Sequence, residues 1–164
     1  MMNETDHKHL VRCAELAEAA LSSNNDPFGS ILVSAEGKVL FEEHNWESTG
    51  DATRHPEIDI ARWAAANLSP ADRAGATVYT SGEHCPMCSA AHAWVGLGRI
   101  VYAVSSAQLT AWRTAMGDGP SPVNGLPINA IAPGLPVEGP DPELQERMHE
   151  LHRRRHAMRA RVPD

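Results

Sequence analysis

The chain has 164 residues, with 14 Lys and Arg against 21 Asp and Glu, which gives a formal net charge of −7. Nucleic-acid-binding proteins usually carry a surplus of basic residues that neutralise phosphates, so this balance argues against that class. No run approaches the roughly 20 apolar residues of a membrane span, and the polar start lacks the apolar core of a signal peptide. Three cysteines, an odd number, do not make a secreted disulfide framework, and we predict a cytoplasmic protein.

The first half of the chain predicts a helix, a hairpin and a second helix. Apolar residues recur at helical spacing over residues 7–22. Two runs typical of strands, 28–33 and 39–41, flank a glycine-containing turn, which favours a hairpin. Pro56 suits the first turn of a helix that we expect to run to about Asn67.

The middle of the chain predicts alternating strands and helices. Residues 76–80 form a short β-branched run, and the cysteine-containing segment after it opens a helix that extends to about Trp94. A strand at 100–104 and a helix at 107–116 follow. A hairpin followed by such alternation indicates an α/β layered fold with a mixed sheet.

The last third is less regular. Residues 117–139 are rich in Pro and Gly, and we expect one short strand at 127–131. A final helix is predicted from about residue 141 to Arg159, as a C-terminal helical extension. Because no repeat or linker divides the chain, we predict a single domain over residues 1–164.

Cys85 and Cys88, with two residues between them, stand at the predicted start of a helix directly after a strand. The helix dipole and the free backbone N–H groups at such a place lower thiol pKa values and favour thiolates. This spacing fits a metal site or a redox pair, and the two cysteines alone do not decide between them.

The segment His55-Pro56-Glu57 favours the metal. It lies at another loop-to-helix junction, so both segments can present side chains at one edge of the sheet. Two thiolates and one imidazole give zinc three protein ligands and leave a fourth position for water, as in catalytic zinc sites. Glu57, two residues after the histidine, is placed to take a proton from that water. His55, Cys85 and Cys88 are therefore the predicted zinc ligands, and Glu57 the predicted catalytic base.

A histidine–x–glutamate segment followed by Cys-x-x-Cys is the zinc deaminase pattern. The sequence resembles the cytidine and deoxycytidylate deaminase superfamily over most of residues 5–115. The resemblance is carried by DPFGSILV, EEHNW, HPEIDIARWA and TSGEHCPMCSAAHAWVGLGRIVYA. The segments TSGEHCPMC and GLGRIVYA are most similar to the branch of guanine deaminases and tRNA adenosine deaminases. Beyond Met116 we find no match.

The resemblance implies a fold, a cofactor and a reaction. The family fold is a three-layer α/β/α arrangement around a mixed five-stranded sheet, usually in a homodimer or larger assembly. It implies one zinc ion per subunit and a small heterocyclic substrate bearing an exocyclic amine. The acidic net charge and the lack of a long apolar run predict no nucleic-acid or membrane partner. In the implied hydrolysis, Glu57 protonates a ring nitrogen and passes a second proton to the leaving ammonia.

The resemblance also implies substrate contacts. Asn45 matches the family asparagine that hydrogen-bonds the base, although a simple turn residue is the alternative at that position. Glu83 matches a position beside the leaving amine. Phe28 and Trp46 are expected to stack on the base or line its pocket. His84 stands where the family has proline, and we expect this difference to bear on substrate choice.

Three functions fit these residues. The first is a hydrolytic deaminase of a free nucleobase or analogue, guanine-, cytosine- or s-triazine-like. The alternative is a tRNA adenosine-to-inosine editing enzyme or a nucleoside deaminase, with the basic cluster (residues 152–156, Arg159 and Arg161) gripping the RNA backbone. That cluster equally fits a solvated helix face. The third function is a zinc-stabilised binding module, whose fourth ligand position would be filled.

Other conspicuous residues have plainer interpretations. Trp63 and Trp94 are predicted to lie in the core or at a subunit interface. His92, four residues after Cys88, is expected to pack or cap rather than bind metal. Cys13 is expected to be buried and inert.

Overall fold

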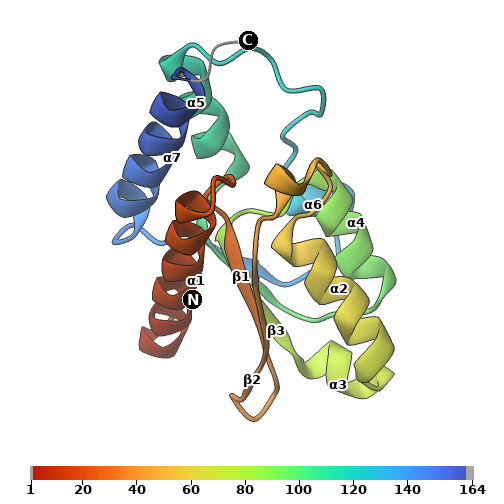
Figure 1. Cartoon of the computed structure of the whole chain (residues 1–164). Coiled ribbons are helices and arrows are strands. Elements are labelled where there is room, and N and C mark those ends of the chain that lie inside the picture. The colour runs from red at the N-terminus through yellow and green to blue at the C-terminus, as the bar shows by residue number, and fades with distance from the viewer. Residues whose placement is uncertain (1, 162–164) are drawn as a thin grey trace.

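The computed structural model describes residues 2–161, and the predicted hairpin is the start of its central sheet (Figure 1). The strands are β1 (Gly29–Val33), β2 (Val39–His44), β3 (Thr77–Gly82), β4 (Ile100–Val104) and β5 (Val137–Glu138). They lie in the order β2-β1-β3-β4-β5. β1 pairs antiparallel with both β2 and β3, whereas β3, β4 and β5 run parallel. The prediction of a mixed five-stranded sheet is confirmed.

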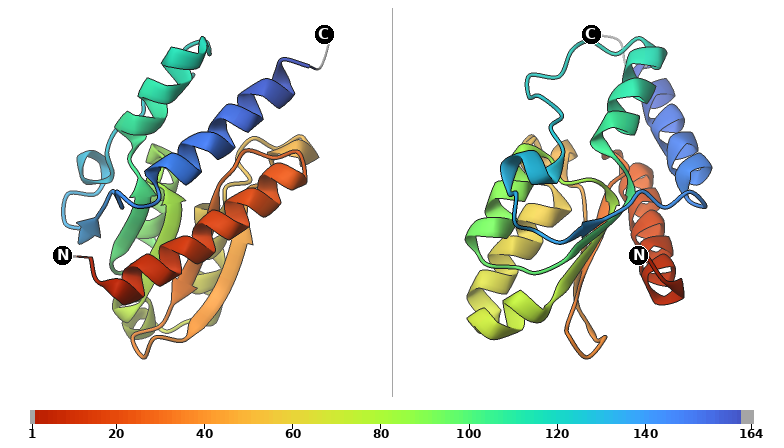
Figure 2. Two further views of the ribbon diagram at one scale, coloured as in Figure 1. Left: turned by 90° about the vertical axis from the view of Figure 1, so that its left-hand side faces the viewer. Right: turned by 180° about the vertical axis from the view of Figure 1, so that it is seen from behind.

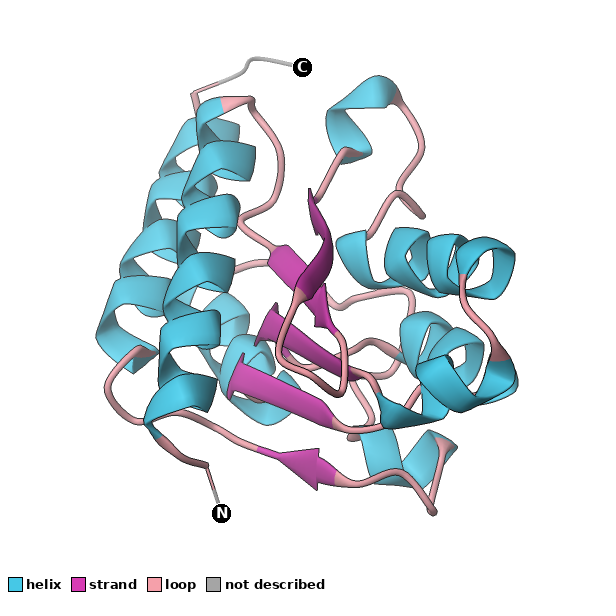
Figure 3. Cartoon of the chain, turned by 90° about the horizontal axis from the view of Figure 1, so that it is seen from below, coloured by secondary structure: helices cyan, strands magenta, loops and turns pink. Residues whose placement is uncertain are grey.

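Helices cover both faces of the sheet and complete the predicted three layers (Figures 1 and 3). One side carries α1 (Glu4–Ser22), α5 (Ser106–Met116) and α7 (Gln145–Arg159). The other carries α2 (Pro56–Asn67), α3 (Pro70–Gly75), α4 (Pro86–Trp94) and the short α6 (Ile128–Ile131). A 3-10 turn, η1, spans Glu47–Thr49. The first and last helices of the chain, α1 and α7, lie side by side on one face of the sheet (Figure 2).

The buried strands are apolar on both faces, as expected of a sheet between two helical layers. Along β1, Ile31 and Val33 belong to the core beneath α1, whereas Leu32 belongs to the core beneath α2. Gly29 permits the close approach of α1, because a Cβ there would lie 2.6 Å from the backbone oxygen of Cys13. The sheet face covered by α2 and α4 is the one on which His55, Cys85 and Cys88 lie, at the starts of these two helices.

Helix starts differ from the prediction where a capping group decides the boundary. α1 begins at Glu4 rather than residue 7, because Asn3 and Asp6 form a reciprocal capping box. α3 occupies a segment for which the sequence predicted no helix, with Ser69 accepting a hydrogen bond from the backbone N–H of Asp72. α7 begins at Gln145 rather than about 141, because Asp141 forms a turn with its side chain accepting from Glu143 N.

The strand predicted at residues 127–131 is wrong. This segment forms α6, and the fifth strand is instead β5 at Val137–Glu138. A short apolar run does not by itself distinguish a strand from a buried helical turn. Here the Glu83 carboxylate accepts the backbone N–H of Ile128 and satisfies the start of the helical turn. Within the described residues, no helix has the length and apolar content to cross a membrane.

Candidate active site

His55, Cys85 and Cys88 come together at the paired starts of α2 and α4. His55 and Cys85 are the N-cap residues of the two helices, and each is followed by proline at the first helical position. Neither side chain caps its own helix, so the imidazole and the thiol are free to point toward each other. His55 Nδ1 lies 3.5 Å from Cys85 Sγ and 3.7 Å from Cys88 Sγ.

These three side chains fit a zinc ion. Tetrahedral zinc with bonds of about 2.3 Å to sulfur and about 2.1 Å to nitrogen separates the nitrogen from each sulfur by about 3.6 Å. A hydrogen bond from Cys88 lowers the pKa of the Cys85 thiol to about 4, whereas the same hydrogen bond and burial raise the pKa of the Cys88 thiol. Among residues 2–161, no further histidine, cysteine or carboxylate joins the cluster. Three ligands without a fourth are typical of an open catalytic site rather than a structural one.

Glu57 lies beside this cluster, in the first turn of α2, with a side chain that is almost completely buried. Its Oε1 atom accepts hydrogen bonds from Ser30 Oγ at 2.9 Å and Thr80 Oγ1 at 2.8 Å. Burial raises the pKa of the Glu57 carboxyl, and His55 and the two hydroxyls act against that rise. A raised pKa makes this carboxylate a stronger proton acceptor than an exposed glutamate. Sequence reasoning missed Ser30 and Thr80. Ser30 is a polar residue in an otherwise apolar strand, but Thr80 lies in a strand with other hydroxyl residues and has no comparable signal.

Asn45 stands at the end of β2 and is almost completely buried. Its backbone N–H donates to Phe28 O, and its side-chain Oδ1 accepts from the backbone N–H of Glu47, 3.0 Å away. The Asn45 side chain therefore does form the turn that the sequence allowed as an alternative role. Because the turn uses only the oxygen, and Nδ2 makes no hydrogen bond to any described residue, the amide still offers a donor to a ligand.

The two aromatic side chains near Asn45 have protein partners. Phe28 meets the His152 ring edge-on, with the ring centroids 5.2 Å apart. A Cβ at Gly82 would lie 2.8 Å from the Phe28 ring, so glycine at the end of β3 is needed for this packing. Trp46 packs against the His44 ring at a tilt of 31°, with the ring centroids 4.3 Å apart, and donates its indole N–H to Glu43.

Both carboxylate oxygens of Glu83 accept hydrogen bonds from backbone N–H groups. One carboxylate oxygen accepts the N–H of Ser106 at 2.8 Å, and the other accepts the N–H of Ile128 at 2.9 Å. These are the first residues of α5 and α6, so one carboxylate caps two helices and interacts favourably with both dipoles. Glu83 thereby fixes the segment that follows β3 relative to the two helices.

His84 is buried, and within the described residues neither of its ring nitrogens has a hydrogen-bond partner. Its ring meets that of His92 edge-on, with the centroids 5.4 Å apart. His92 Nε2 lies 2.8 Å from Gly98 O, so this histidine binds the backbone and does not join the metal cluster, as expected.

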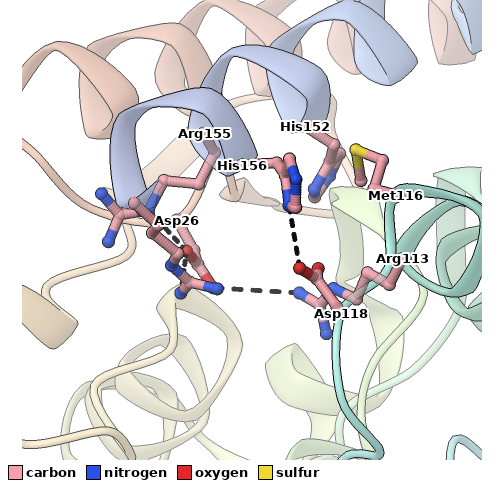
Figure 4. A pocket seen from close by; sticks show the side chains of 8 residues that line it. Asp26, Arg113, Met116, Asp118, His152, Arg155 and His156 are labelled. Atoms are coloured by element: carbon pink, nitrogen blue, oxygen red, sulfur yellow. Dashed lines mark hydrogen bonds and ion pairs between the residues drawn. The ribbon is translucent and has the colours of Figure 1, made fainter. Parts of the chain in front are cut away.

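A second group of charged side chains lies between α5 and α7 (Figure 4). Arg155 and Arg159 of the basic cluster both bind Asp26, at 2.8 and 2.6 Å. Both also bind Glu47, two residues after Asn45, at 3.1 Å. α7 is thus tied to the segment that carries the candidate base-binding asparagine.

Comparison with known proteins agrees with this geometry. Residues 3–104 match the family described as the cytidine and deoxycytidylate deaminase zinc-binding region. This range contains the metal cluster, Glu57 and Asn45. It ends at β4, so α5 and α7 lie outside the match.

The individual relatives are named as deaminases of different substrates. A probable cytosine deaminase from Schizosaccharomyces pombe is 29% identical over 73% of this chain and 72% of that protein. Guanine deaminase from Bacillus subtilis is 32% identical over 63% of this chain and 65% of its own length. A tRNA-specific adenosine deaminase from Rickettsia bellii is 31% identical over 56% and 65%, respectively.

The structure of a guanine deaminase from Nitrosomonas europaea superimposes with a TM-score of 0.67 at 22% identity. That similarity covers 96% of this chain and 86% of the other, so the fold is shared beyond the range of the family match. With the matched region, the shared fold and three side chains that fit zinc, the chain belongs to the zinc-binding cytidine and deoxycytidylate deaminase family.

Proposed function

We propose that this chain is a hydrolytic deaminase that releases ammonia from a free nucleobase or a close analogue, guanine-, cytosine- or s-triazine-like. The observation that carries the proposal is the buried Glu57 carboxylate beside a three-ligand cluster to which residues 2–161 add no fourth ligand. A binding module without turnover would need neither a proton-transferring carboxylate nor an open ligand position.

The proposed roles follow from what each side chain can donate or accept. Zinc held by His55, Cys85 and Cys88 would supply a Lewis acid that lowers the pKa of water. Glu57 takes a proton from the attacking water, gives it to the ring nitrogen and transfers a second proton to the leaving ammonia. The amide Nδ2 of Asn45 donates a hydrogen bond that orients the ring. Phe28, Trp46 and His84 remain proposed pocket residues, while Glu83 orders the surrounding helices.

The ion pairs of the basic cluster favour a small substrate over tRNA. Four of its five arginines bind carboxylates of this chain: Arg153 with Glu146 and Glu150, Arg154 with Glu18, and Arg155 and Arg159 with Asp26 and Glu47. A guanidinium already paired in this way contributes little to phosphate binding, because the intramolecular pair must first be broken. The net charge of −7 acts in the same direction.

We also propose that α7 belongs to the same domain and borders the pocket of its own chain. Its His152 ring packs on Phe28, and two of its arginines bind Glu47. These contacts support a substrate pocket that is closed by α7 of the same chain rather than by a helix of a neighbouring copy.

We predict a homodimer whose interface includes Trp94. This side chain is 87% exposed at the end of α4, and tryptophan is enriched in subunit interfaces. Trp94→Glu is expected to convert a dimer of 17.7 kDa chains into monomers in size-exclusion chromatography with light scattering. Val39→Glu, which alters another exposed apolar residue, should leave the dimer intact. A monomeric parent protein, or a dimeric Trp94→Glu variant, would contradict this prediction.

The proposed function predicts ammonia release from the zinc-loaded protein with at least one small heterocycle. The screen should contain purines, pyrimidines, pterins, triazines and the corresponding nucleosides, with tRNA as a separate arm. We expect turnover of a free base, and tRNA binding that is weak and lost at moderate salt. Turnover of tRNA adenosine without turnover of any free base would favour the editing function instead. If neither small heterocycles nor tRNA release ammonia, both the free-base and the tRNA-editing functions are wrong.

A further inference from the structure

Ser30 and Thr80 form a cross-strand pair beneath the start of α2. They are directly opposite each other in the antiparallel pairing of β1 and β3, and their hydroxyl oxygens are 2.8 Å apart. The next pair on the same face, Leu32 and Val78, belongs to the apolar core that packs on α2. Both hydroxyl side chains are completely buried. They therefore occupy positions where the period-two pattern of the strands calls for apolar residues.

A buried hydroxyl is unfavourable unless it makes hydrogen bonds. Both hydroxyl oxygens lie within hydrogen-bond distance of one acceptor, Oε1 of Glu57, at 2.9 and 2.8 Å, and Thr80 Oγ1 also lies 3.0 Å from Gly82 O. Each hydroxyl has one hydrogen, so when both donate to Oε1 they do not donate to each other or to Gly82 O. Both contacts are made to the same carboxylate oxygen, which leaves Oε2 outside the hydroxyl pair. The sheet thus fixes the rotation of the carboxylate while leaving one of its oxygens available.

We propose that Ser30 and Thr80 are positioning residues that hold Glu57 through Oε1, so that Oε2 is the oxygen that exchanges protons with water and substrate. This assignment rests on the proposed deaminase function. The pair acts only through Glu57, and its loss allows the carboxylate to rotate away from the orientation needed for proton transfer. A misplacement of about 1 Å in such a group can lower a rate about a hundredfold.

The test compares Thr80→Val, which removes the hydroxyl at nearly constant volume, with Thr80→Ser, which keeps it. We expect Thr80→Val to lower kcat about tenfold to a hundredfold with KM changed less than about threefold, and Thr80→Ser to stay near the parent. Ser30→Ala should act like Thr80→Val. In a Glu57→Gln background, Thr80→Val should cause little further loss, because it acts through the group already replaced.

Ser81→Ala is the matched control. Ser81 is also buried, lies on the same strand and accepts a hydrogen bond from Gly29 N, but it does not contact Glu57. Its loss should lower thermal stability without lowering kcat. Equal losses of kcat from Thr80→Val in both backgrounds, or parent-like kcat in Thr80→Val, would overturn the proposal.

Crystal structures provide a readout that does not depend on turnover. The Glu57 carboxylate should keep one orientation in the parent and in Thr80→Ser, and should be rotated or split between conformers in Thr80→Val. An unchanged carboxylate in Thr80→Val would also overturn the positioning role. If the parent protein deaminates none of the compounds, the proposed function fails, whereas the carboxylate orientation still tests the pair.

Discussion

Glu57→Gln is expected to lower the deamination rate about 10²- to 10⁴-fold, the range for loss of a general acid–base group. The amide has nearly the same shape and can still accept hydrogen bonds from Ser30 and Thr80, but it cannot take up and return a proton at neutral pH. Zinc content and thermal stability should remain close to those of the parent. The measurement is kcat by coupled ammonia assay, with zinc quantified on the same sample.

A conservative control separates this loss from a change in overall charge. Glu36 lies in the exposed turn between β1 and β2, and Glu36→Gln removes the same charge without touching the site. It should retain the full rate. Activity close to the parent in Glu57→Gln would end the assignment of Glu57 as the proton-transferring group.

Cys85→Ser is expected to remove both the metal and the activity. A serine hydroxyl is not deprotonated at neutral pH, so it replaces a thiolate ligand with a much weaker one. We expect zinc content after dialysis to fall below about a tenth of the parent and deamination to fall below detection, because two protein ligands hold zinc far less well than three. Zinc is measured by atomic absorption, and folding by circular dichroism.

The chain offers its own control for this variant. Cys13 is buried in α1 and belongs to the core on the opposite face of the sheet from α2. Cys13→Ala should keep zinc and activity even if it lowers stability through the small cavity it creates. Full zinc content in Cys85→Ser would show that the three-ligand assignment is wrong.

The local signals in the sequence were sufficient for much of the fold. Alternating and helical apolar patterns located all the longer helices and four of the five strands. Pro56 and Pro86 at the first position of α2 and α4 mark the two helix starts from which the metal cluster is built. The strand predicted at 127–131 was wrong because the segment is too short for its periodicity to distinguish a strand from a helical turn. Its conformation depends instead on the Glu83 carboxylate, which is distant in the sequence and accepts the backbone N–H of Ile128.

The sequence by itself determined the residue types of the site: a histidine and a glutamate two residues apart, and two thiols three residues apart, each at a predicted helix start. These are short-range features, and the preferences of helix starts and ligand spacing are enough to recognise them. Only the tertiary structure decided which hydroxyls hold Glu57 and that Glu83 caps two helices. It also decided that Arg155 and Arg159 of the basic cluster pair with Asp26 and Glu47. Each of those contacts joins residues more than 20 positions apart, and a hydrogen bond or ion pair at such separation depends on how the helices pack, which no local pattern encodes.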